Sequence, residues 1–366
     1  MSFFRASAEK YLDPICAIDS PTKFHETRDD SLKGNMERGW NGLPFRPISQ
    51  HYLALFGKKV YKIPVVIADD CPNRRGLKGM KPCVFCDEWG SAAHSEAFEI
   101  NLQEQIIKYR EQINKRYKAE QFLVYFQAYT NTFLKLQSLE MHFQTALKFD
   151  FVKGLVVGTR PDCLSKGVLD LWSKTQEQKP VFVELGVQSF DDKQLSFLQR
   201  GHSAEDSIKA IHKIHTQTKV DLGIHLIFGN PGETSNDIIR AAQICNELPI
   251  TNVKLHHLHV LKNTPLESMY SLGDFSPINF EQYCENVRLF LEHLSPAIYV
   301  QRLAAYSSRW NELVAPAWTV NKMKTHQGII DHLRSKQSYQ SKLFLTKNIP
   351  EQMLQEQILQ QSLASN

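Results

Sequence analysis

The sequence has no long hydrophobic run and almost no excess of charge of either sign. No stretch approaches the roughly 20 apolar residues that span a bilayer. Its start, MSFFRASAEK, lacks both the basic beginning and the apolar core of a secretory signal. A net charge of +4 over 366 residues is too small to predict nucleic-acid binding. We therefore expect a soluble, cytoplasmic protein that has no membrane partner.

Cysteine is also scarce, and its distribution is uneven. Of seven cysteines, four are scattered without a pairing pattern, which argues against a disulfide framework and favours a reducing compartment; these are Cys16, Cys163, Cys245 and Cys284. The other three, Cys71, Cys83 and Cys86, lie in the short stretch CPNRRGLKGMKPCVFC, residues 71–86. We call this stretch the cysteine loop. Three cysteines so close together indicate a shared ligand such as a metal centre.

From about residue 60 onward, short β-branched runs alternate with helical periods. Six runs predict strands, at residues 61–68, 121–127, 153–159, 181–189, 220–229 and 252–261. Strands that alternate with helices predict parallel βαβ units. Pro64 lacks a backbone donor, so the first strand should lie at a sheet edge, which an open barrel has and a closed barrel lacks. We therefore expect an α/β fold with an incomplete (β/α)6 TIM-like barrel.

Helix signals support this layout. Apolar residues recur at helical spacing after the cysteine loop, at Leu102, Ile106, Tyr109, Ile113 and Tyr117. Gly201 is expected to stop one helix, and the next is expected to begin at a cap formed by Ser203 and Asp206. Thr234 and Asp237 repeat that capping pattern.

The ends of the chain carry weaker signals. We expect an N-terminal extension at residues 1–50, a core barrel at 51–305 and a helical C-terminal extension at 306–366. The segment AIYVQRL, residues 297–303, can add a further strand. An apolar stripe in the Gln-rich tail predicts that the tail docks on its own domain; it comprises Met353, Leu354, Ile358 and Leu363.

Two metal centres fit three neighbouring thiolates. Structural zinc takes four protein ligands, and His94, eight residues after Cys86, can complete a Cys3His site. A [4Fe–4S] cluster usually takes four thiolates, so three leave one iron open to another ligand. The cysteine loop follows the carboxyl end of the first predicted strand, where α/β barrels build their active sites. This position favours the cluster.

The cysteine loop resembles the cluster loop of the radical S-adenosylmethionine (SAM) superfamily, with Phe85 directly before the last cysteine. Its spacing of eleven and then two residues differs from the commonest CxxxCxxC pattern. It is similar to the branch around the catalytic subunit of the Elongator complex, and most similar to an uncharacterised bacterial family with CPNR-type loops. The resemblance covers roughly residues 51–325, with matching segments at 56–64, 125–132, 157–164, 183–189, 227–234 and 253–266.

The resemblance implies an enzyme that reductively cleaves SAM at a [4Fe–4S] cluster. The product is a 5′-deoxyadenosyl radical, which modifies an unidentified substrate: a tRNA nucleoside, a small molecule or a peptide. Such an enzyme needs an external one-electron donor of the flavodoxin or ferredoxin type. The alternative is a zinc-stabilised barrel that acts as a binding module without redox chemistry.

The resemblance also suggests cofactor-binding positions. After the second strand, Gln127, Thr130 and Asn131 are expected at the amino group of SAM, although they also suit an ordinary polar turn. On the fourth strand, Glu184 and Gln188 share a face by alternation and are expected near the ribose and methionine groups, with a purely structural hydrogen-bond network as the alternative. Gly229 and Asn230 follow the fifth strand, where relatives contact adenine. Phe85 completes this set.

Two further groups carry candidate chemistry. Arg160 is expected to bind a carboxylate or phosphate, and Asp162 to cap the next helix. Cys163 would begin that helix, where the macrodipole lowers a thiol pKa, and it is a candidate for substrate handling. His257 and His259 share one face of the sixth strand and His256 the other; the pair that faces the cavity is a candidate for acid–base catalysis.

Overall fold

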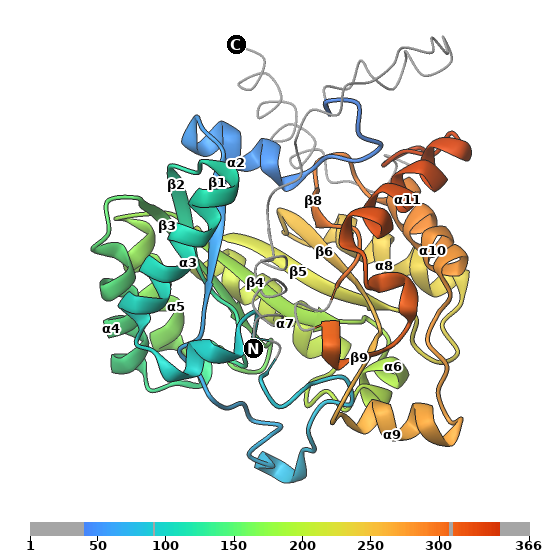
Figure 1. Cartoon of the computed structure of the whole chain (residues 1–366), viewed down its shortest axis with the longest axis horizontal. Helices are drawn as coiled ribbons and strands as arrows, with labels where there is room; N and C mark the ends of the chain where they lie inside the picture. The colour runs from blue at the N-terminus through green and yellow to red at the C-terminus, as the bar shows by residue number, and fades with distance from the viewer. Residues whose placement is uncertain (1–39, 91, 307–309, 345–366) are drawn as a thin grey trace, which may run out of the picture.

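The computed structural model describes residues 40–90, 92–306 and 310–344. A curled sheet of seven parallel strands forms its centre, and helices cover the outer face of the sheet (Figure 1). The strands, in their order across the sheet, are β1 (Val60–Val65), β2 (Gln121–Phe126), β3 (Val152–Thr159), β4 (Val181–Gln188), β5 (Asp221–Phe228), β6 (Asn252–His257) and β8 (Tyr299–Arg302).

The two edges of the sheet confirm the open barrel. β1 pairs only with β2 in the described sheet, and Pro64 lies opposite Tyr125 in that pairing. A missing backbone donor does no harm on the side of β1 that has no partner strand. β8 pairs with β6 and forms the other edge, so residues 297–303 do add a seventh strand.

The helices of the described chain connect and flank these strands. They are α2 (Ile48–Phe56), α3 (Leu102–Tyr117), α4 (Leu136–Leu147), α5 (Lys166–Gln176), α6 (Asp192–Phe197), α7 (Ala204–Gln217), α8 (Ser235–Glu247), α9 (Pro265–Leu272), α10 (Phe280–His293) and α11 (Lys322–Ser335). Short 3-10 turns include η3 (Leu77–Gly79) in the cysteine loop. A two-stranded antiparallel pair, β7 (Val260–Leu261) and β9 (Leu313–Ala315), lies beyond β6.

The α3 helix shows how the predicted apolar stripe positions the cysteine loop. Ile106 and Tyr109 on this face are fully buried. Gln105 is buried on the same helix. Its side-chain oxygen accepts from the Val66 backbone N–H (2.8 Å), and its side-chain nitrogen donates to the Val66 carbonyl (2.9 Å). These bonds satisfy the backbone of the chain where it leaves β1. The residue after β1, from which the chain runs on to the cysteine loop, is therefore fixed to α3.

The predicted caps are mostly confirmed. Ser203 with Asp206, and Thr234 with Asp237, form capping boxes at α7 and α8. The prediction for Gly201 was wrong, because α6 already ends at Phe197. A Cβ atom at position 201 would lie 1.9 Å from the Met80 sulfur. Gly201 therefore lies against the Met80 side chain of the cysteine loop and does not end a helix.

The helical C-terminal region is present as α11, which packs on α10. The apolar stripe predicted at residues 353–363 and most of the expected N-terminal extension lie outside the described residues. Within the described ranges, every helix is too short or too polar to cross a membrane.

Candidate functional site

A cavity of about 230 Å³ opens at the carboxyl ends of the parallel strands. The cysteine loop forms one wall, and residues from β2 to β8 form the others. Of the residues that the sequence predicted for the site, those that line the cavity are Cys71, Cys83, Phe85, Cys86, Gln127, Thr130, Arg160, Glu184, Gln188, His257 and His259. Parallel strands end at one edge of a barrel, so positions far apart in the sequence meet there.

The cysteine loop is held by hydrogen bonds to distant segments. The Val84 N–H donates to the Leu198 carbonyl (3.3 Å), and the Val84 carbonyl accepts from the Leu266 N–H (3.0 Å). The Asn73 side chain donates to the carbonyls of Lys81 and Gln199, at 2.7 Å each. The cysteine loop, whose own secondary structure is the short turn η3, is therefore fixed in place by bonds to distant segments.

The thiols lie among buried groups and guanidinium groups. Burial raises the pKa of Cys86 to about 12, with the charges of Cys83 and Asp87 adding to the rise and Arg74 opposing it. Arg200 Nη1 lies 3.3 Å from Cys83 Sγ. Thiols in such a setting lose their protons when a metal centre supplies positive charge. The three side chains therefore fit a metal-bound role.

His94 does not fit as a fourth ligand. Its ring stacks on Tyr109 with centroids 4.1 Å apart, and it is outside the set of residues that line the cavity. Across the described chain, no three His, Cys, Asp or Glu side chains converge closely enough to hold one metal ion. A mononuclear zinc site draws its ligands to about 2.3 Å from one centre, whereas a cluster spreads its thiolates over several irons. Without His94 the loop offers three thiols, the number that a [4Fe–4S] cluster with one open iron requires.

Three residues in the turn after β2 were predicted to bind SAM, and only two of them face the cavity. Gln127 and Thr130 line the cavity, whereas Asn131 does not. The Asn131 amide donates to the Phe126 carbonyl (2.8 Å) and the Gly158 carbonyl (2.9 Å), at the ends of β2 and β3. Asn131 therefore joins the carboxyl ends of β2 and β3 and does not itself line the cavity.

A buried polar network surrounds Glu184 on β4. Its carboxylate accepts from Lys62 (2.5 Å), Lys254 (2.9 Å), the Tyr125 hydroxyl (2.7 Å) and lies 2.7 Å from His225 Nε2. Burial alone would raise the pKa of Glu184, but the charges of Lys254 and Lys62 outweigh it and hold the pKa well below its usual value. The carboxylate is thus ionised and already has four partners within the chain.

The sequence reasoning missed the basic partners of Glu184. Lys62, His225 and Lys254 lie on three different strands. The two lysines are buried, with 2% of Lys62 and 4% of Lys254 exposed. The available signal was a lysine in the middle of an apolar strand run, because a charge that is nearly fully buried requires a partner. Arg200 and Arg302, which also line the cavity, were likewise missed.

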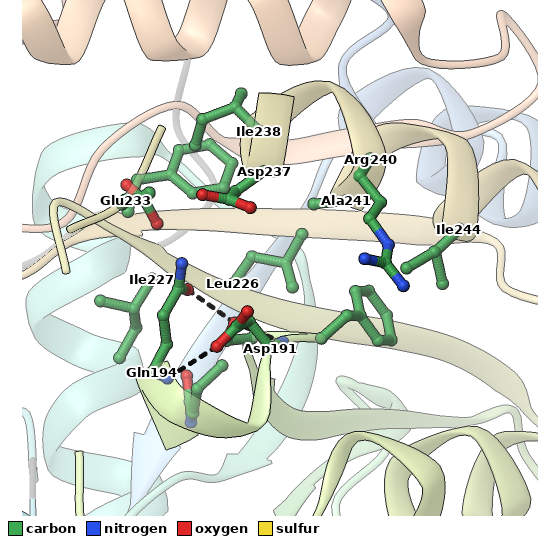
Figure 2. Close-up of a pocket in the computed structure, with 14 residues that line it drawn as sticks. Asp191, Gln194, Leu226, Ile227, Glu233, Asp237, Ile238, Arg240, Ala241 and Ile244 are labelled. Atoms are coloured by element: carbon green, nitrogen blue, oxygen red, sulfur yellow. Dashed lines mark hydrogen bonds between the residues drawn. The ribbon is translucent and has the colours of Figure 1, made fainter. Parts of the chain in front are cut away.

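The segment after β5 lies beside a second, smaller hollow between α6 and α8 (Figure 2). Gly229 and Asn230 are not among the residues that line the main cavity. The Gly229 N–H donates to Glu233 (2.6 Å), and the Asn230 amide donates to the Ile227 carbonyl (2.8 Å). Burial raises the pKa of Glu233 to about 7, against the hydrogen bonds that Glu233 accepts from the Gly229 N–H and the Asn230 side chain, which lower it. The Glu233 carboxylate therefore links the two ends of this turn through its bond with the Gly229 N–H.

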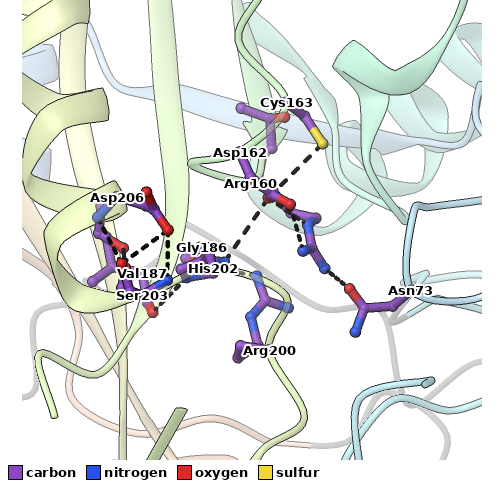
Figure 3. Close-up of polar contacts among 12 residues, drawn as sticks. Asn73, Arg160, Asp162, Cys163, Gly186, Val187, Arg200, His202, Ser203 and Asp206 are labelled. Atoms are coloured by element: carbon purple, nitrogen blue, oxygen red, sulfur yellow. Dashed lines mark hydrogen bonds and ion pairs between the residues drawn. The ribbon is translucent and has the colours of Figure 1, made fainter. Parts of the chain in front are cut away.

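The Arg160 segment corrects two predictions (Figure 3). The Arg160 guanidinium donates to both carboxylate oxygens of Asp162, at 2.8 Å each. The helix α5 begins only at Lys166, and Ser165 is its cap, accepting from the Val168 N–H (3.3 Å). The predictions that Asp162 caps this helix and that Cys163 begins it were wrong, because Ser165 provides the capping hydroxyl three residues later.

The thiol of Cys163 also differs from the prediction. Burial raises its pKa to about 12, and the charge of Asp162 adds to this rise. A helix dipole falls off within the first turn, and Cys163 precedes that turn. Cys163 is not among the residues that line the cavity. The expectation of a lowered pKa was therefore wrong.

All three histidines of the sixth run line the cavity, rather than one pair. β6 ends at His257, so the alternation of a strand does not extend to His259. Burial lowers the pKa of His256 and His257 well below the usual value and that of His259 to about 4. The three imidazoles are thus neutral at neutral pH.

Comparison with known proteins agrees with this architecture. The sequence profile of the Radical SAM superfamily matches residues 65–245, and that of the Radical_SAM C-terminal domain matches residues 250–335. The uncharacterized protein MJ0486 of Methanocaldococcus jannaschii is 36% identical over 79% of this chain and 89% of its own length. The protein YhcC of Escherichia coli strain K12 is 33% identical over 73% of this chain and 85% of its own length.

The Elongator branch is also similar. The tRNA uridine(34) acetyltransferase of Methanocaldococcus infernus is 33% identical over 36% of this chain and 24% of its own length. The structure of the archaeal Methanocaldococcus infernus Elp3 has a TM-score of 0.58 at 19% identity, over 77% of this chain and 64% of that one. The predicted relationship is thus confirmed at the level of fold. This chain belongs to the radical SAM superfamily and is an enzyme.

Proposed function

We propose that this enzyme holds a [4Fe–4S] cluster through Cys71, Cys83 and Cys86 and cleaves SAM there to start a radical modification of a substrate. When bound, the cluster and SAM together supply reductive cleavage of the sulfonium C–S bond, which yields methionine and a 5′-deoxyadenosyl radical. One observation carries the proposal: the three cysteines of one loop open onto the cavity at the strand ends of a radical SAM barrel.

The residues of this chain have separable roles in that proposal. The three thiolates would hold the cluster and leave one of its irons without a protein ligand, for SAM. Gln127 and Thr130 lie at the rim that follows β2 and are proposed to bind the amino group. Gln188, at the carboxyl end of β4, is proposed to contact the ribose or the methionine part. Glu184 is proposed to position Lys62 and Lys254 rather than to contact SAM, because its carboxylate oxygens already accept hydrogen bonds from these two lysines.

The charge distribution around the thiols also supports a cluster. Arg200 donates to Cys83, and the charge of Cys86 raises the pKa of Arg74, although burial opposes this. Two fixed cations beside three thiolates limit the negative charge that the buried loop must carry. Neutral His257 and His259 can exchange hydrogen bonds with a substrate, but with lowered pKa values they are poor general acids at neutral pH.

Anaerobic purification and reconstitution test the proposal. We expect about four irons per chain and release of 5′-deoxyadenosine from SAM on reduction by dithionite. The variant Cys86→Ala should lose both. The matched control is Cys163→Ala, which removes a thiol outside the cavity and should keep both. One colourless zinc ion per chain in the wild type would instead support the binding module.

The substrate remains a separate proposal. A tRNA nucleoside is suggested by the similarity to tRNA uridine(34) acetyltransferase, and a small molecule or a peptide is the other candidate. Modified nucleosides and metabolites should be compared between cells with the gene, cells without it and cells with the Cys86→Ala variant. The compound that is lost in both defective strains identifies the class. A flavodoxin or ferredoxin is the proposed electron donor.

A further inference from the structure

Three basic side chains form a row across neighbouring strands on one wall of the cavity. His225 on β5 lies opposite Lys254 on β6, and Lys254 lies opposite Arg302 on β8. All three line the cavity, together with His256 and His257. We call these five residues the basic wall. The cysteine loop follows β1 at one edge of the sheet, whereas Arg302 ends β8 at the other edge.

Positive charge in and behind the basic wall exceeds negative charge. Lys62 and Lys254 share one carboxylate, that of Glu184. Arg302 has no Asp or Glu partner among the residues that the structure describes: its Nη2 lies 2.6 Å from His256 Nε2, and its buried Nε has no hydrogen-bond partner. Burial lowers the pKa values of the three histidines, so they are neutral. The cations Lys62, Lys254 and Arg302 thus lie near a single carboxylate, that of Glu184.

His257 adds an independent sign of a missing ligand. Its side chain is 1% exposed, and neither ring nitrogen has a hydrogen-bond partner. The ring packs against Trp318, with centroids 4.4 Å apart, so it cannot turn freely toward water. Buried polar atoms nearly always have a partner, and leaving one unsatisfied is costly. A ligand that enters the cavity would supply that partner.

Other cations are already close to the cysteine loop. Arg200 donates to Cys83, and Arg160 is neutralised by Asp162. The excess charge at the β6–β8 end is therefore not needed to balance the thiolates. Guanidinium groups bind carboxylates and phosphates through paired, charge-assisted hydrogen bonds, and Arg302 has the free Nε that such binding uses.

We propose that the basic wall binds an anionic group of the substrate, a carboxylate or a phosphate, with Arg302 as the main donor and His257 as a second contact. This inference rests on the proposed function in calling the ligand a substrate. It adds a substrate class, a molecule with a small anionic group, and assigns that group to β5, β6 and β8, at the other end of the strand order from β1. SAM also carries a carboxylate, so the experiment has to separate the two sources.

Thermal unfolding of the reconstituted protein provides the first test, with inorganic phosphate and acetate as probes at constant ionic strength. We expect one of them to raise the Tm of the wild type, since a ligand that binds only the folded state stabilises it. Arg302→Gln should weaken that binding by about tenfold or more, and Arg302→Lys by less. The control Arg240→Gln, an exposed arginine on α8, should behave as the wild type.

Equilibrium dialysis of SAM against the same holoproteins identifies the source of the anion. We expect Arg302→Gln to bind SAM within about twofold of the wild type. An equal loss of SAM and probe binding would assign the site to the carboxylate of SAM and overturn the inference. The inference also fails if neither probe shifts the wild-type Tm, or if Arg302→Gln responds as the wild type does.

A measurement on the wild type avoids dependence on a variant that fails to fold. Phenylglyoxal modifies accessible arginines, and the effective probe should slow its reaction at Arg302 but not at Arg240, as followed by mass spectrometry of peptides. Equal rates with and without the probe would overturn the inference. Release of 5′-deoxyadenosine tests the proposed function separately. Failure of the anion-binding test would therefore leave the proposed function standing, and failure of 5′-deoxyadenosine release would leave the anion site standing.

Discussion

Arg200 and Cys83 are in direct contact: the Nη1 atom of the arginine lies 3.3 Å from the cysteine sulfur. They are 117 residues apart in the sequence. The arginine is held in this position because its Nη2 also donates to the Gly186 carbonyl (3.0 Å). A fixed cation that donates to a thiolate favours the more negative, reduced state of a bound cluster.

We therefore predict that Arg200→Gln lowers the reduction potential of the reconstituted cluster, while its iron content is retained. Redox titration followed by electron paramagnetic resonance measures the potential. Arg75→Gln is the control, because that arginine is exposed in the same loop and pairs with Asp70. An unchanged potential in Arg200→Gln would show that the contact has only a structural role.

Glu184→Gln should destabilise the barrel strongly. The change leaves the buried cations Lys62 and Lys254 without their shared counter-charge, and breaking a buried ion pair in this way costs about 3–5 kcal/mol. Urea unfolding measures the difference in the free energy of unfolding. Glu120→Gln breaks the exposed pair with Lys58 and should change stability little. Equal effects of the two variants would contradict a structural role for the Glu184 network.

Glu233 should make the stability fall as the pH rises. Its pKa is about 7 in the folded protein, where burial raises it above its usual 4.5. Between these values the folded state binds more protons than the unfolded state, so stability is lost from about pH 4.5 to 7 and then levels off. The loss is at most about 3 kcal/mol.

The measurement is urea unfolding from pH 5 to 8 for the wild type and Glu233→Gln. The wild type should lose stability relative to the variant as the pH rises, because glutamine does not titrate. Parallel curves for the two proteins would contradict a raised pKa at this position.

Cys163 should be an unreactive thiol. With a pKa of about 12, it is almost entirely protonated at pH 8, and only the thiolate is a strong nucleophile. Its alkylation by iodoacetamide should be about a hundredfold or more slower than that of glutathione, as measured by peptide mass spectrometry on the holoprotein. A rate similar to that of glutathione would restore the predicted activated thiol.

The sequence predicted the fold well because its signals are local and repeated. The strand runs, Pro64 at an edge and the capping pairs Ser203–Asp206 and Thr234–Asp237 each depend on a few neighbouring residues. The failures at Asp162 and Gly201 share a cause. In both cases a residue fits the local rule, but the helix boundary lies a few residues away, at Ser165 for α5 and at Phe197 for α6.

By itself the sequence determined that three thiols lie in one loop after the first strand of a parallel barrel, because spacing and periodicity are properties of the chain. Only the tertiary structure decided what surrounds them. Arg200 reaches Cys83, two lysines share Glu184, and Arg302 stands without an acidic partner in the described part of the chain. Charge pairing depends on distances through space, and the curl of the sheet sets those distances.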